Sequence, residues 1–178
     1  KSVMPADKVI ISGTIGDHGA AILSKRKDLG FKSEIMSDSA PLNSLIDGIL
    51  CTSPNIHCMR DVTRGGLGAI MCEIAAQSGC EITIEEKLIP VKEEVRGVCE
   101  ILGVDPLFLA NEGKVVVICP ADDVESVMAA MRGHRHGADA AIIGQVWKKG
   151  RGRLLLNTVI GGTREIDLPT GELVPRIC

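Results

Sequence analysis

The sequence predicts an α+β fold, in which several helices pack on a mixed sheet and an extended tail follows. Short apolar runs rich in β-branched residues alternate with longer amphipathic segments. Hydrophobic residues make up 45% of the 178 residues but aromatic residues only 2%, so aliphatic side chains have to build the core. From Leu168 onward, two prolines and a glycine leave no room for a helix.

The first half of the chain is expected to contain three strands and three helices. Asp17 is placed as the N-cap of the first helix, and Gly79 ends the third as a C′ residue. The expected strands are Lys8–Ser12, Ile56–Arg60 and Cys80–Glu86, and the expected helices are Ala20–Leu29, Asp38–Cys51 and a segment running from the glycines at 65–68 to about Ser78.

The second half is expected to add two helices and three or four strands. The helix Pro90–Leu102 has proline at its start and Gly103 after its end. The β-branched run Lys114–Cys119 is typical of a central strand, and the amphipathic helix Ala121–Met131 follows it. Strands are then expected at Ala141–Trp147 and Arg153–Asn157, joined by a turn at 148–152, with a short edge strand at Thr163–Asp167.

The composition excludes several classes of function. The net charge is −3 and there is no Tyr, which argues against a nucleic-acid reader with basic patches and aromatic platforms. No apolar run approaches the ~18 residues of a membrane span, and no secretory signal is visible. Seven irregularly spaced cysteines predict free thiols in a reducing, cytoplasmic environment, with Cys72, Cys80, Cys99 and Cys119 in apolar stretches.

Cys178 is the most conspicuous chemical group, because it is a thiol on the last residue of an extended segment. We expect two units: a domain over 1–167 and a mobile tail over 168–178. The last ten residues reach about 30 Å when fully extended. A nucleophilic sulfur on such an arm suits a carrier that visits several sites, whereas the alternative is an accidental terminal cysteine.

Two glycine-rich turns are candidate anion sites, because each joins a strand to the N-terminus of a helix. The first is Gly13–Gly19, in which His18 in the first helical turn is a candidate base or a surface residue. The second is Asp61–Gly68, in which Arg64 is suited to a phosphate contact. The alternative for both is a tight turn in which glycine only permits close packing.

Asn111-Glu112-Gly113 precedes the predicted central strand. A carboxylate at this place is suited to a general base or to a metal, although a loop charge is the commoner role of Glu. No zinc site is expected: there is no Cys-x-x-Cys, and His134 and His136 have no paired cysteines.

Taken together, these motifs resemble the HypE family of carbamoyl dehydratases, which act in the maturation of nickel–iron hydrogenases. The resemblance covers almost the whole chain and rests on four segments: Ser12–Gly19, Arg60–Leu67, Asn111–Gly113 and Pro175-Arg-Ile-Cys178. It implies the layered α/β/α fold of the C-terminal domain of PurM, the aminoimidazole ribonucleotide synthetase. It also implies that an N-terminal ATP-binding domain, which supplies most of the ATP and Mg²⁺ ligands and a homodimer core, is absent from this chain.

The resemblance also implies a reaction and a set of roles. The partner HypF carbamoylates Cys178, ATP drives dehydration of the carboxamide to a thiocyanate, and the HypC–HypD complex receives the cyanide. Glu112 is then the candidate base and His18 its assistant. The phosphates face residues of the second turn and the nearby amide: Asp61, Thr63, Arg64, Gly65, Gly66 and Asn111. No residue is assigned to a metal.

Two alternatives remain open. One is another ATP-dependent synthetase of the same superfamily, such as selenophosphate synthetase, which carries its reactive Cys or selenocysteine in an N-terminal loop. The other is a non-catalytic docking module in which the thiol of Cys178 is incidental. Loss of function on Cys178→Ser separates the HypE-like interpretation from both.

Overall fold

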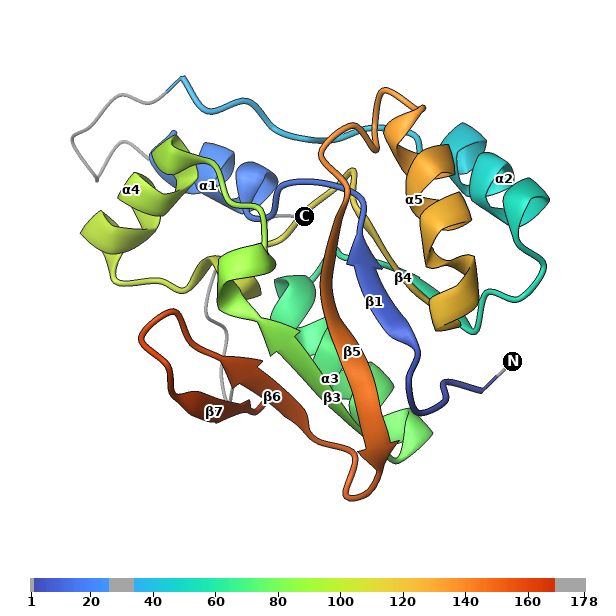
Figure 1. Ribbon diagram of the computed structural model, residues 1–178. Coiled ribbons are helices and arrows are strands. Elements are labelled where there is room, and N and C mark those ends of the chain that lie inside the picture. Colours follow the sequence, from blue (N-terminus) through green and yellow to red (C-terminus); the bar gives the residue numbers. More distant parts are fainter. Residues whose placement is uncertain (1, 26–33, 169–178) are drawn as a thin grey trace.

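A seven-stranded sheet runs through the molecule in the order β2-β4-β1-β5-β3-β6-β7 (Figure 1). The computed structural model describes residues 2–25 and 34–168. The strands are β1 (Lys8–Ile11), β2 (Cys58–Asp61), β3 (Cys80–Glu85), β4 (Val115–Cys119), β5 (Ala141–Lys149), β6 (Leu154–Asn157) and β7 (Thr163–Ile166). The helices are α1 (Asp17–Ser24), α2 (Asn43–Thr52), α3 (Gly66–Ser78), α4 (Glu93–Leu102) and α5 (Val124–Arg132), with short 3₁₀ turns η2 (Glu86–Leu88), η3 (Pro106–Phe108) and η4 (Ala121–Asp123).

The sheet is mixed, as predicted. All adjacent strands are antiparallel except β3 and β6, which run parallel. β5 and β6 follow one another in the chain, but β3 lies between them and pairs with both. β4 lies inside the sheet, between β2 and β1, and all five of its residues are buried, which confirms the predicted central strand.

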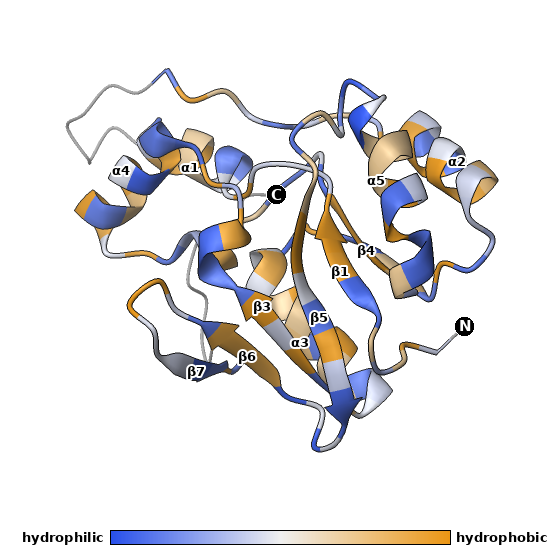
Figure 2. Cartoon of the chain, in the orientation of Figure 1, coloured by the Kyte–Doolittle hydropathy of each residue, from blue (hydrophilic) through white to orange (hydrophobic). Residues whose placement is uncertain are grey.

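Helices cover both faces of the sheet, so the layered α/β/α architecture is confirmed. Along β1, Val9 and Ile11 point to one apolar cluster and Ile10 to the other, because successive side chains of a strand alternate between its faces. The first cluster contains residues of α3, and the second contains residues of α2 and α5 (Figure 1). In Figure 2 the strands between these layers carry mostly hydrophobic residues.

A third apolar cluster joins α1 to α4 beside the sheet. Small residues of α1 allow the two helices to approach closely, and the loop residue Leu109 completes the contact. Its buried members are Ala20, Ala21, Leu23, Ile35, Val95, Val98, Cys99 and Leu109. None of the described helices is long and apolar enough to cross a membrane.

Four predicted helix starts differ from the structure, and the predicted end of the first helix at Leu29 lies outside the described residues. The helix expected from Ala121 begins at Val124, after the 3₁₀ turn Ala121–Asp123. Asp17 is the first residue of α1 rather than its N-cap, and Gly16 takes the cap position with φ 83°. The helix expected from Asp38 begins at Asn43, because the carboxylate of Asp38 is engaged by the segment 112–114. The helix expected from Pro90 begins at Glu93.

Candidate functional site

Three of the motifs singled out in the sequence meet at one edge of the sheet. Because β1 and β2 both run antiparallel to β4, their C-terminal ends lie at the start of β4. The register pairs Ile11 with Val116 and Asp61 with Val115. The two glycine-rich turns and the segment 111–113 are therefore neighbours in space, although they lie far apart in the sequence.

Asn111 connects the two turns. Its side chain is fully buried, and its Oδ1 accepts a hydrogen bond of 2.8 Å from the backbone amide of Gly16. Its Nδ2 donates to the carbonyl oxygens of Val62 (3.0 Å) and Leu109 (3.2 Å), and its own amide donates to Val62 at 3.1 Å. This geometry gives Asn111 a positioning role, and its assignment to the nucleotide stays a prediction.

The second turn requires glycine. Gly65 and Gly66 have φ of 74° and 65°, in the left-handed region. A Cβ on Gly66 would lie 2.5 Å from the carbonyl oxygens of both Leu107 and Leu109. Close packing of the turn on the segment 107–109 thus explains Gly66 by itself, so this glycine alone is no evidence of a ligand.

The helices that follow both turns begin without a side-chain cap. Gly65 caps α3 and Gly16 caps α1, and neither helix has a capping side-chain hydrogen bond. The amide of Gly19 already donates to the carbonyl of Ala110 and that of Gly66 to the carbonyl of Thr63, each at 3.0 Å. The remaining amide groups in the first turn of such a helix favour an anion. Beside α3, Arg64 is exposed, and Thr63 donates from Oγ1 to Oδ2 of the exposed Asp61 at 3.0 Å.

The two candidate bases are linked to neighbouring residues of the segment before α2. Nδ1 of His18 lies 2.8 Å from Oγ of Ser37. The amide of Glu112 donates to Oδ1 of Asp38 at 3.1 Å, while Nζ of Lys114 lies 2.9 Å from Oδ2 of Asp38. The carboxylate of Glu112 is on an exposed residue, so it is accessible to a substrate.

Asp17 and Lys92 form an ion pair that the sequence reasoning missed. The carboxylate of Asp17 has no exposed surface, its Oδ1 lies 2.8 Å from Nζ of Lys92, and Oγ1 of Thr14 donates to its Oδ2. The hydrogen bond to Asp17 is the main reason that the pKa of Lys92 is raised. The pair ties the first turn to the start of α4. Lys92 lies 75 residues after Asp17 in the sequence. The residues around Asp17 therefore gave no sign of this ion pair.

A polar groove of about 320 Å³ opens beside the first turn. Ser12, Thr14, Ser37, Lys92 and His136 are among its lining residues. The pKa of His136 is lowered, first by desolvation and then by nearby cations, of which Arg135 is the largest contributor. The histidine loop at 134–136 thus contributes the imidazole of His136 to the groove.

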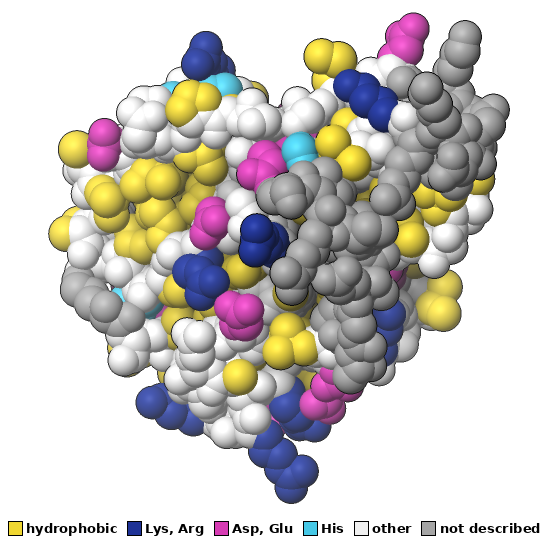
Figure 3. Space-filling model, turned by 180° about the vertical axis from the view of Figure 1, so that it is seen from behind, with side chains coloured by type: hydrophobic (Ala, Val, Ile, Leu, Met, Phe, Trp, Pro, Cys, Tyr) yellow, Lys and Arg dark blue, Asp and Glu magenta, His cyan; other side chains and the backbone are white. Residues whose placement is uncertain are grey.

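In the view from behind, hydrophobic side chains form a patch on the side where α2 lies, with charged and histidine side chains beside it (Figure 3). Leu50 of α2 is 51% exposed. Charged and apolar groups are thus adjacent on this face.

The described cysteines are free thiols. Cys72, Cys80, Cys99 and Cys119 are buried, as predicted, and Cys51 is exposed. Burial raises the pKa of Cys72, Cys99 and Cys119 to about 11, so these thiols are unreactive at neutral pH. Cys178 and all of the predicted tail except Leu168 lie outside the described residues. Among the residues that the structure describes, no group of three or more His, Cys, Asp or Glu is placed to hold a metal ion.

Comparison with known proteins gives one family model and a set of similar relatives. The family model described as "AIR synthase related protein, C-terminal domain" matches residues 5–157. The chain is 49% identical over 174 residues to carbamoyl dehydratase HypE of Azotobacter vinelandii, covering 98% of this chain and 51% of that protein. The chain thus spans about half the length of the curated relatives it matches.

Two solved structures are similar throughout. One is the hydrogenase maturation protein HypE in complex with ATP, with a TM-score of 0.92 and 41% identity, covering 99% of this chain and 54% of that one. The other is a HypE–HypF complex, with a TM-score of 0.88 and 46% identity, covering 95% of this chain and 55% of that one. These findings confirm the resemblance and the fold inferred from the sequence.

Proposed function

Since the chain belongs to the family of the AIR synthase-related C-terminal domain, we propose that it forms the C-terminal half of an ATP-dependent carbamoyl dehydratase in the maturation of nickel–iron hydrogenases. The observation that carries the proposal is the junction at Asn111, which holds both glycine turns at one edge of the sheet. The relatives named HypE, one of them bound to ATP, support the reaction.

In the proposed reaction, the thiol of Cys178 first receives a carbamoyl group from a HypF-type transferase, the partner in the similar complex. The carboxamide oxygen then attacks the γ-phosphorus of ATP, and ADP leaves. Loss of two protons from the nitrogen expels phosphate and leaves a thiocyanate on the sulfur. Overall, the thiocarbamate and ATP give the thiocyanate, ADP, hydrogen phosphate and one proton.

The described residues suit the steps that involve charge. The uncapped start of α3 and the exposed Arg64 favour the phosphates. Thr63 lies at the same turn, and the carboxylate of Asp61 holds it by a hydrogen bond of 3.0 Å, since an anion does not bind the phosphates directly. Glu112, accessible at the edge, accepts protons from the nitrogen, and His18, held by Ser37, assists it.

Mg²⁺ accompanies ATP in this proposal, but the described residues do not form a site for it. Asp61 is a single exposed carboxylate at the turn, and no group of three or more His, Cys, Asp or Glu among the described residues is placed to hold a metal ion. We therefore assign most Mg²⁺ ligands to the half of the protein that lies upstream. That half also forms the proposed homodimer, and the thiocyanate passes from Cys178 to iron held by a HypC–HypD complex. The buried free thiols agree with a cytoplasmic location.

Mass spectrometry of the C-terminal peptide tests the proposal on the full-length protein. With HypF and carbamoyl phosphate we expect a carbamoyl-sized gain on Cys178, and loss of one water only when Mg·ATP is added. A Cys178→Ser variant is the control and should show neither change. An unmodified Cys178 in the presence of demonstrably active HypF would contradict the proposal and favour a docking module.

A further inference from the structure

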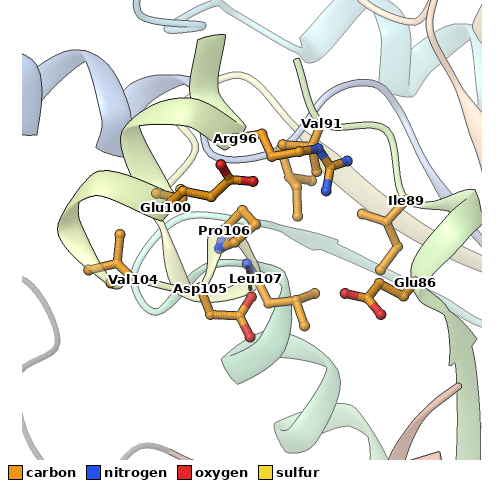
Figure 4. A pocket seen from close by; sticks show the side chains of 12 residues that line it. Glu86, Ile89, Val91, Arg96, Glu100, Val104, Asp105, Pro106 and Leu107 are labelled. Atoms are coloured by element: carbon orange, nitrogen blue, oxygen red, sulfur yellow. Dashed lines mark hydrogen bonds between the residues drawn. The ribbon is translucent and has the colours of Figure 1, made fainter. Parts of the chain in front are cut away.

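A second cavity of about 420 Å³ lies between η2, α4 and η3 and reaches the first glycine turn at Ile15 (Figure 4). It shares no lining residue with the polar groove. Its lining is largely apolar: Ile15, Ile89, Val91, Cys99, Val104, Pro106 and Leu107. A cavity of this size accommodates one or two large side chains of another protein.

Acidic groups predominate around the cavity. Glu86, Glu100 and Asp105 line it together with a single cation, Arg96. Figure 4 shows Arg96 and Glu100 on the side of α4 and Glu86 on the opposite side. Asp105 already receives hydrogen bonds from Arg164 at 2.6 Å and from the amide of Leu107 at 2.9 Å. Arg164 thus neutralises Asp105, which leaves Glu86 and Glu100 against the single cation Arg96, so an occupant with basic groups fits better than an acidic one.

An ordered turn presents apolar side chains next to this cavity. Val159 and Ile160, between β6 and β7, are 67% and 92% exposed, and Leu88 in η2 is 45% exposed. The amide of Val159 donates to Oε2 of Glu86 at 2.9 Å, which places the turn at the cavity rim. In Figure 2 this turn is a hydrophobic segment at the surface.

The turn is held firmly in this conformation. Four hydrogen bonds close it: the amide of Thr158 donates to the carbonyl of Gly162 at 2.8 Å, Oγ1 of Thr158 donates to the same oxygen at 3.0 Å, and the amides of Gly161 and Gly162 donate back to Thr158, each at 3.0 Å. Branched apolar side chains fixed outward in this way are pre-organised for contact, because little conformational freedom is left to lose on binding.

We propose that the cavity and the turn together form a docking surface for a partner protein, which inserts apolar side chains and carries Lys or Arg beside them. We name it the α4–β6 surface and define it by the cavity lining with Leu88, Val159 and Ile160. A second copy of this chain is a poorer occupant, because in a two-fold interface the same carboxylates would face each other. The proposal goes beyond the function proposed above. Its test uses the two partners named there, HypF and the HypC–HypD complex, as probes.

Titration calorimetry with the full-length protein tests the surface. Ile160→Asp and Glu100→Lys change residues that are exposed in this half of the protein, so the fold of this half should be unaffected. The matched control is Ile101→Asp, an isoleucine that is 70% exposed on α4 and does not line the cavity. We expect Ile160→Asp to weaken binding to HypF or to the HypC–HypD complex by about tenfold or more. Glu100→Lys should weaken binding to the same partner and reduce its dependence on salt.

The proposal is overturned if both partners bind Ile160→Asp as tightly as the unchanged protein. It is also overturned if the Ile101→Asp control loses as much affinity, or if sedimentation shows that Ile160→Asp alters self-association instead. ATP-dependent dehydration on a previously carbamoylated Cys178, measured in the same preparations, reports on the proposed function separately. That activity should be unchanged in all three variants.

Discussion

The backbone amide of Gly16 and the side chain of Asn111 are joined by a buried hydrogen bond of 2.8 Å that spans 95 residues of sequence. The same side chain donates to Val62 at the base of the second turn. One amide group therefore fixes the relative position of the two glycine turns, and its removal tests how far the candidate site depends on that position.

Asn111→Ala should destabilise the chain by about 3 kcal/mol, because the amide of Gly16 and the carbonyls of Val62 and Leu109 lose a buried partner. Urea denaturation measures this change. Asn43→Ala, at an exposed residue of α2, is the control and should cost far less. A similar loss for the two variants would contradict the role of Asn111 as a connector.

Gly66→Ala should destabilise the chain by about 2 kcal/mol or more, since a Cβ at φ 65° would be strained and would lie 2.5 Å from two carbonyl oxygens. Gly97→Ala is the matched control in α4, where a Cβ meets nothing within 4 Å. That variant should be more stable by about 0.5–1 kcal/mol, because alanine favours the helix. Thermal denaturation of both variants compares the two glycines directly.

Lys92→Met should destabilise the chain by about 3 kcal/mol, because it leaves the buried carboxylate of Asp17 without its cation. Lys92→Arg keeps the charge and should cost much less. Equal losses in urea denaturation would mean that packing of the lysine stem, rather than its charge, matters at this position.

The Asp17–Lys92 pair also predicts how stability depends on pH. The pKa of Lys92 is raised above the ordinary value of 10.5 in the folded chain. The contribution of the ion pair to the stability of the fold is therefore complete below pH 10.5 and is lost as the pH rises through the raised pKa of Lys92. We expect the free energy of unfolding to fall more steeply in alkali for the unchanged chain than for Lys92→Arg, whose guanidinium stays charged. Parallel curves would contradict this.

Glu112→Gln should slow dehydration in the full-length protein by about 10²–10⁴-fold without preventing carbamoylation of Cys178, because it removes a base but not the carrier. Stability should hardly change, since Glu112 is exposed and its hydrogen bond to Asp38 uses the backbone. Single-turnover mass spectrometry distinguishes the two steps. Glu34→Gln, at another exposed glutamate, is the control and should react normally.

Thiol labelling tests the buried cysteines. In the native chain Cys51 should react quickly with iodoacetamide, whereas Cys72, Cys99 and Cys119, with pKa values of about 11, should react only on unfolding. Peptide mapping after timed labelling identifies each site. Fast labelling of Cys119 under native conditions would contradict its burial in β4.

Most strands and helices could be predicted because their apolar periodicity is local. The β-branched run of β4 indicated a strand buried on both faces, and Gly79 and Gly103 marked helix ends at which φ is 64° and 65°. The strand order could not be predicted, because periodicity does not say which strands pair. Nothing in the turn at 148–152 indicates that β3 lies between β5 and β6.

The candidate site was predicted only in part, because the sequence does not show which distant segments are neighbours in space. The glycine turns were visible as motifs, but the contacts that join them are long-range. Asp17 reads as a cap from its neighbours alone, and its buried pairing requires knowledge that Lys92 lies beside it. Asp38 likewise resembles a helix start until the segment 112–114 is placed against it.

The position of β1 in the sheet has a consequence for synthesis of the chain. β1 pairs with β4 and β5 only, and the bond from Lys8 to Gln145 spans 137 residues. On a ribosome adding ~5–20 residues per second, the first strand of this domain waits on the order of 10 s for its last neighbour. During that interval its apolar residues Val9, Ile10 and Ile11 have no complete sheet to join, so the nascent domain exposes an aggregation-prone strand until β5 has emerged.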